Sequence, residues 1–206
     1  MNFFEKNGFY VERNAISKES AKLLANDFDI LRNCIYHVEQ IESNDLYKFR
    51  DGQAEKCFSW YSPFCFESLL VTMLPKIEFI TGKTLYPCYS YGRIYYHGSK
   101  LVRHIDRFSC EYSVTMTIDI DDTPWDIHFN NRDNQIETIS LDIGDMCVYK
   151  GAELYHWRDT YKGNRQVQAF LHYVDANGDF SNYKYDTRPL LGLSNGYRNY
   201  NYDLIT

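Results

Sequence analysis

The hydrophobic period of this chain changes near residue 86, and this change limits the folds that it can adopt. Past that point, four segments have the alternating or β-branched and aromatic pattern of strands: Tyr91–Tyr96, Tyr112–Ile118, Asp145–Tyr149 and Gln166–Tyr173. Short polar turns, such as residues 97–99 and 162–164, separate them. Many short strands joined by polar turns predict a sandwich or jelly roll.

The first 83 residues have a helical pattern instead. Ser17 can cap a helix whose apolar residues recur at intervals of three and four, from Ala21 to Ile35. A second helix is predicted to start with Ser62 as its cap and Pro63 at its first position, to break at Pro75 and to continue as a shorter helix that ends at Gly82. The predicted fold class is therefore mainly β with N-terminal helices that cover one face of a jelly roll.

The sequence has no linker and no internal repeat, so we expect its 206 residues to form a single domain. We expect N-terminal helices over about residues 1–83 and a jelly-roll core over about 84–175. The remainder, 176–206, is rich in Asn, Gly, Tyr and Asp and is expected to be an irregular tail packed on the domain.

The composition argues against several classes of protein. Hydrophobic residues make up 44% and charged residues 24%, as in soluble globular proteins. The net charge of -6 comes without a basic run, so we expect no nucleic-acid partner. No apolar run approaches the roughly 18 residues of a membrane span, and the first residues lack a signal-peptide pattern. We therefore expect a cytoplasmic protein without a membrane partner. None of its six cysteines forms a CxxC pair, and we expect most of them to be reduced core residues.

One pair of residues suggests a metal site. His104 and Asp106 are two positions apart in a strand-like segment, so their side chains point to the same side. An imidazole and a carboxylate placed together supply two ligands of a 2-His-1-carboxylate iron site. Taken alone, such a pair is more often simply exposed on the surface of a strand.

A later segment supplies candidates for the rest of the site. His156 can provide the third ligand, and Arg165 follows nine residues later at the start of the next predicted strand. If that strand pairs with the one that carries His156, Arg165 folds back toward the metal. A guanidinium in a barrel interior needs an anion and can bind a carboxylate through two hydrogen bonds. Separately, His156 could be a structural histidine and Arg165 a surface charge.

With these residues in this order, the sequence resembles the iron(II)- and 2-oxoglutarate-dependent oxygenases of the prolyl-hydroxylase-like type. Their pattern is HxD, a distal His and a basic residue about ten positions beyond it. More narrowly, the chain resembles a group of small proteins common in marine viruses and cyanobacteria. The similarity extends over about residues 80–175 and lies in four segments: 87–107, 110–115, 124–125 and 144–173.

The resemblance implies a double-stranded β-helix, the jelly roll of cupin-like proteins, that uses Fe(II), 2-oxoglutarate and O2. The implied activity is that of a non-haem dioxygenase that hydroxylates an unidentified substrate and releases succinate and CO2. The metal ligands would be His104, Asp106 and His156. Arg165 would pair with the distal carboxylate of 2-oxoglutarate, and Tyr96 would contact the same carboxylate.

One position departs from the family's pattern. Some members have a serine two residues after the arginine, and this chain has Val167 there. The hydrogen bond of that serine must come from another residue, and the candidates are Tyr96, Thr115 and Thr117. Arg93 and Arg107 flank the predicted mouth, where they could meet an anionic group. The four other histidines, at positions 37, 97, 128 and 172, are interpreted as structural.

Two other functions remain open at this point. A cupin-like isomerase or binding protein also holds a metal in a β-barrel, and a non-enzymatic jelly-roll protein would bind no metal. The substrate is not specified by the sequence: a peptidyl proline, a free amino acid, another metabolite or a nucleobase would all be compatible. The oligomeric state is equally open, and a viral origin would place the protein in the host cytoplasm.

Overall fold

The computed structural model describes residues 3–39 and 52–196. Two antiparallel sheets form its centre. The larger sheet has the strand order β1-β8-β5-β10-β3-β2, and the smaller has the order β4-β9-β6-β7. The strands of the larger sheet are β1 (Phe9–Glu12), β2 (Cys57–Tyr61), β3 (Leu85–Tyr96), β5 (Tyr112–Ile120), β8 (Met146–Tyr149) and β10 (Arg165–Asp175). Those of the smaller are β4 (Leu101–His104), β6 (Ile127–Asn130), β7 (Ile136–Ile139) and β9 (His156–Arg158).

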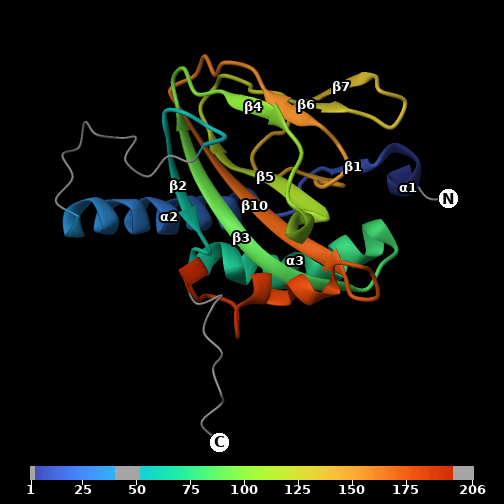
Figure 1. Cartoon of the computed structure of the whole chain (residues 1–206). Coiled ribbons are helices and arrows are strands. Elements are labelled where there is room, and N and C mark those ends of the chain that lie inside the picture. The colour runs from blue at the N-terminus through green and yellow to red at the C-terminus, as the bar shows by residue number, and fades with distance from the viewer. Residues whose placement is uncertain (1–2, 40–51, 197–206) are drawn as a thin grey trace, which may run out of the picture.

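Helices cover the face of the larger sheet that points away from the smaller sheet (Figure 1). The long ones are α2 (Lys18–Val38) and α3 (Phe64–Thr81), and α1 (Phe3–Asn7) precedes β1. The largest hydrophobic core lies between these helices and the sheet. Gly92 on β3 permits their close approach, because a Cβ atom there would collide with the rings of Phe28 and Phe66. Within residues 3–39 and 52–196, no helix is both long and apolar enough to cross a membrane.

The two longest strands, β3 and β10, divide their side chains between the helices and the space between the sheets. On β10, Val167, Ala169 and Leu171 join the helix-side core, whereas Phe170 and His172 line the cavity on the other side. This alternation follows from the two-residue period of a strand. The architecture confirms the predicted fold class, a jelly roll covered on one face by helices.

The N-terminal third is only partly as predicted. Ser17 does cap α2, since its hydroxyl accepts a hydrogen bond from the Ser20 amide at 3.1 Å. The predicted break at Pro75 is wrong, because α3 runs through it. Pro75 and Val71 are both exposed, so the Val71 carbonyl that loses its helical partner can bind water instead. The capping prediction for Ser62 is also wrong: α3 begins one residue later, with Pro63 as its N-cap, and the Ser62 hydroxyl binds Arg188.

The region expected to hold only helices also contributes both edges of the larger sheet. β1 pairs with β8, and β2 pairs with β3. These strands have four and five residues, which is too short for a period to be recognised in the sequence. Past β10, the chain turns through a 3-10 segment, η2 (Ser181–Thr187), and packs on the domain as far as it is described, to residue 196.

Candidate metal centre

Three predicted ligands converge where two strands of the smaller sheet pair. His104 ends β4 and His156 begins β9, and the two are direct partners in the register. Asp106 follows two residues after His104. Its Oδ1 atom lies 3.4 Å from His104 Nε2 and 3.6 Å from His156 Nε2. One potential ligand atom from each residue lies within 4.8 Å of the others, so the structure brings all three together.

Hydrogen bonds fix which nitrogen of each imidazole faces the centre. Nδ1 of His104 is 2.8 Å from the Val102 carbonyl, and Nδ1 of His156 is 3.0 Å from the Leu154 carbonyl. A carbonyl oxygen can only accept, so each Nδ1 carries the proton and donates it. Each Nε2 therefore faces Asp106 and is the nitrogen available to bind a metal, the arrangement that a metal-binding histidine needs.

The carboxylate is held from its other side. Asp106 Oδ2 accepts a hydrogen bond from the Ser113 hydroxyl at 2.9 Å, and the Asp106 amide donates to the Gly151 carbonyl at 2.8 Å. Burial alone would raise the pKa of Asp106, but the nearby His156 and His104 outweigh it and hold the pKa well below the usual range. Burial lowers the pKa of His156, partly opposed by Asp106. Neutral imidazoles and an ionised carboxylate are the forms that bind a metal.

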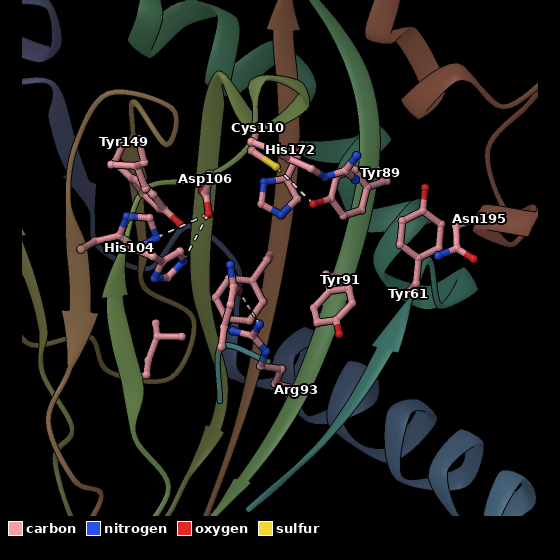
Figure 2. Close-up of a pocket in the computed structure, with 16 residues that line it drawn as sticks. Tyr61, Tyr89, Tyr91, Arg93, His104, Asp106, Cys110, Tyr149, His172 and Asn195 are labelled. Atoms are coloured by element: carbon pink, nitrogen blue, oxygen red, sulfur yellow. Dashed lines mark hydrogen bonds and ion pairs between the residues drawn. The ribbon is translucent and has the colours of Figure 1, made fainter. Parts of the chain in front are cut away.

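The three residues lie at one end of a cavity of about 640 Å³. Figure 2 shows Asp106 beside His104, with Tyr89, Tyr91 and Arg93 of β3 along the wall and Asn195 at the far end. Arg93 is 5% exposed, and its guanidinium hydrogen-bonds to the Tyr95 hydroxyl and the Gln53 side chain. Arg93 and Arg107, which are expected to flank the mouth, both line the cavity.

His172, interpreted from the sequence as structural, also faces this cavity. Its Nδ1 lies 2.9 Å from the Ser113 hydroxyl, the same group that binds Asp106. Burial lowers its pKa to about 4. With Asp106 and Cys110 it forms a second group whose potential ligand atoms lie within 4.8 Å of one another. His172 and Phe170 are two residues apart on β10 and therefore face the same side. This spacing is the sequence signal that could have placed His172 in the cavity.

Arg165 and Tyr96 do not lie near the three predicted metal ligands His104, Asp106 and His156, called the triad below. Arg165 forms ion pairs with Asp119 and with Asp29 of α2, the latter at 2.6 Å, on the helix side of the larger sheet. Tyr96 is its register partner on β3 and packs against the helix-side core. The reason is topological: β9 belongs to the smaller sheet and β10 to the larger, so these strands do not pair as the sequence argument assumed.

A different arginine lies between the sheets. Arg158 is two residues after His156 on β9 and is 1% exposed. Its Nη1 donates to the Trp125 carbonyl, while Nε and Nη2 have no hydrogen-bond partner among the described residues. Burial lowers its pKa, which the electrostatic effects of Tyr95 and Tyr149 partly oppose. Sequence reasoning missed Arg158, although its i+2 spacing from His156 is the signal that could have found it.

No protein-family model and no curated protein matches the sequence. Solved structures do match the fold. AviO1 from Streptomyces viridochromogenes superposes with a TM-score of 0.65 at 14% identity, over 85% of this chain and 93% of its own. HygX from Streptomyces hygroscopicus, with nickel, 2-oxoglutarate and hygromycin B bound, gives 0.63 at 10% identity over 84% and 85%.

A prolyl-4-hydroxylase from Pseudomonas putida gives a TM-score of 0.60 at 12% identity, over 84% of this chain and 95% of its own. All three likenesses extend over most of both chains, although little sequence is shared. The fold of this chain is thus the one found in a prolyl hydroxylase and in a protein with nickel and 2-oxoglutarate bound.

Proposed function

We propose that this protein is a non-haem oxygenase that uses Fe(II), 2-oxoglutarate and O2 to hydroxylate a small-molecule or peptide substrate. The observation that carries the proposal is the convergence of His104, Asp106 and His156 at the end of a cavity. The proteins with the same fold support it, since HygX has 2-oxoglutarate bound and another is a prolyl hydroxylase.

The donor set fits iron. Two histidines and one carboxylate on one side of a metal leave positions open for other ligands, as in Fe(II) oxygenases. An Fe(II) ion bound there would supply the oxidation of a C–H bond by O2, coupled to decarboxylation of 2-oxoglutarate to succinate. The two other functions that the sequence left open, a metal-binding isomerase and a structural protein, would not require an anion site. The unpaired Arg158 guanidinium fits an anionic cosubstrate.

The chain's own contribution is to orient ligands and to exclude water. The Val102 and Leu154 carbonyls fix the two imidazoles, and Ser113 fixes the carboxylate. Tyr89 packs against His172, with ring centroids 4.5 Å apart, and forms a wall beside the triad. The cavity volume is within the range of about 300–1,000 Å³ that small-molecule sites occupy.

The first test measures metal binding and turnover together. His104→Ala and Asp106→Ala should each weaken Fe(II) binding at least about a hundredfold and abolish succinate formation, because each removes one of three protein ligands. Metal binding is measured by anaerobic titration, and succinate is measured in the presence of 2-oxoglutarate and a panel of peptides and metabolites. His37→Ala, on the exposed side of α2, is the matched control and should behave as wild type.

The outcomes separate the competing functions. Equal metal binding in wild type and both variants would refute the triad. Tight metal binding without any succinate or oxygen consumption would favour the cupin-like isomerase or binding protein. If succinate is released but the product is epimerised rather than hydroxylated, the proposed cofactors stand and the proposed reaction is wrong.

A further inference from the structure

The space between the sheets contains a cation without a carboxylate in direct contact. Asp126 acts on Arg158 electrostatically, but no described carboxylate lies within 4 Å of its guanidinium, and two of its nitrogens lack hydrogen-bond partners. Its Cζ atom lies 5.1 Å from the centre of the Trp125 ring. An uncompensated buried charge is strongly unfavourable, and it persists in proteins mainly where an anion or a function requires it.

A second donor faces the same region. Tyr95, on β3 of the opposite sheet, is fully buried and is among the groups that act electrostatically on Arg158. The Tyr95 hydroxyl accepts a hydrogen bond from Arg93 at 3.1 Å, and no described residue accepts its own proton. Burial raises the pKa of Tyr95, so the hydroxyl keeps that proton and can donate it.

These donors are within reach of the metal ligands. Arg158 and His156 lie on the same face of β9, two residues apart, which is about 6.6 Å along a strand. The four carbon–carbon bonds of a five-carbon chain, each ~1.5 Å, extend over about 5 Å in a zigzag. The length of such a molecule matches this spacing; to contact Arg158 it would extend beyond the cavity lining, which includes His156 but neither Arg158 nor Tyr95.

We propose that Arg158 and Tyr95, not Arg165 and Tyr96, bind the distal carboxylate of the 2-oxo acid cosubstrate. This inference rests on the proposed function and names its anion subsite. Arg165 is already paired with two carboxylates, those of Asp29 and Asp119, so an incoming anion would meet like charge there. The subsite makes the protein selective for a dicarboxylic oxo acid over a monocarboxylic one.

The experiment compares two ligands on the Mn(II)-loaded protein by calorimetric titration under nitrogen. They are 2-oxoglutarate and 2-oxopentanoate, which has the same chain length but no distal carboxylate. Wild type should prefer 2-oxoglutarate at least roughly thirtyfold, because breaking one side of a buried charged pair costs about 2–5 kcal/mol. Arg158→Met should lose that preference and leave 2-oxopentanoate affinity within about threefold of wild type.

Neighbouring residues on the opposite face provide the controls. Arg165→Met and Tyr96→Phe should keep the preference for 2-oxoglutarate, whereas Tyr95→Phe should reduce it about fivefold, the loss of one hydrogen bond to a neutral donor. Arg158→Lys should be intermediate, since an ammonium keeps the charge but not the two-pronged geometry. Mn(II) affinity and the melting temperature of the ligand-free variants establish that each is folded.

The possible failures are distinct. If wild type binds Mn(II) but neither oxo acid, the proposed function fails and the subsite falls with it. If wild type binds 2-oxoglutarate and Arg158→Met and Arg158→Lys bind it equally well, the subsite assignment is wrong and the function stands. If Arg165→Met alone loses 2-oxoglutarate binding, then Arg165 and not Arg158 binds the distal carboxylate.

Discussion

Gly151 lies directly against the carboxylate of Asp106, and only a residue without a side chain fits there. A Cβ atom at this position would be 2.5 Å from Asp106 Oδ2 and would also collide with the Ser113 hydroxyl. Gly151→Ala should therefore displace the carboxylate and lower Fe(II) or Mn(II) affinity about 10–100-fold, the range found when a metal ligand loses its support. Anaerobic metal titration measures this effect. Gly52→Ala, at a site with no atom within 4 Å of the added Cβ, is the control, and equal affinity in both variants would contradict the prediction.

For single residues, the sequence predicts which side chains share a face when they lie on the same strand. His104 and Asp106 share a side because they are two residues apart, and this local rule holds whatever the surrounding fold. The same rule applied to His156 would have identified Arg158. Arg165 belongs to another strand, and its side depends on where β10 begins after a six-residue connection, which no local pattern specifies.

Among the elements, the turn before β8 is tied to the end of β1 by one buried carboxylate. Asp145 accepts hydrogen bonds from the Asn14 amide at 2.8 Å, from Arg13 at 2.6 Å and from the Asp142 amide at 3.1 Å. Burial would raise the pKa of Asp145, but these donors outweigh it and lower the pKa below its usual value. Asp145→Ala should destabilise the protein by about 2–3 kcal/mol at pH 7, the loss of hydrogen bonds to a charged group.

The lowered pKa fixes the direction of the pH dependence. The unfolded chain takes up the Asp145 proton more readily than the folded chain does, so the stabilisation is complete above about pH 3.9 and is lost as the pH falls below it. The free-energy difference between wild type and Asp145→Ala should therefore shrink between pH 7 and pH 3. Urea unfolding at both pH values measures it, and a constant difference would show that the charge of Asp145 is not involved.

The elements themselves were predictable to different degrees. The long helix α2 and the central strands have enough residues for their periods to be read, and their predicted positions agree with the structure. The short edge strands β1 and β2 acquire their conformation from pairing with β8 and β3, so their sequence alone does not specify it. Pro75 is tolerated because its side of α3 faces solvent, a property of packing that the sequence does not state.

For the molecule as a whole, one buried ion pair joins the C-terminal segment to the domain. Arg188 has no exposed side-chain surface and pairs with Glu67 of α3 at 3.2 Å. It also donates to the Ser62 hydroxyl and to the Cys88 carbonyl. The segment that it anchors carries Asn195 to the cavity wall.

Arg188→Met should destabilise the protein by about 3–5 kcal/mol, because Glu67 would be left buried without its cation. Urea unfolding measures the loss, and limited proteolysis should release the segment beyond residue 176 before the jelly roll is cut. Lys83→Met is the control: the Lys83 side chain is 42% exposed, so water reaches its pair with Asp175 and its loss should cost less than about 1 kcal/mol. Similar costs for the two variants would argue that Arg188 does not anchor the segment.

The two-sided character of β10 restricts how the length of this chain can change. Between Val167 and His172, its odd positions pack under the helices and its even positions face the other way, with Phe170 and His172 in the cavity wall. Adding one residue within the strand would exchange the two sets from that point on. A hydrophobic side chain would then replace His172 in the cavity, and a polar one would enter the helix-side core. The connection 159–164 is constrained as well, because Tyr161 is fully buried and its hydroxyl donates hydrogen bonds to Asp121 and to the Arg165 carbonyl. β10 can therefore accept substitutions but not a change in the number of its residues.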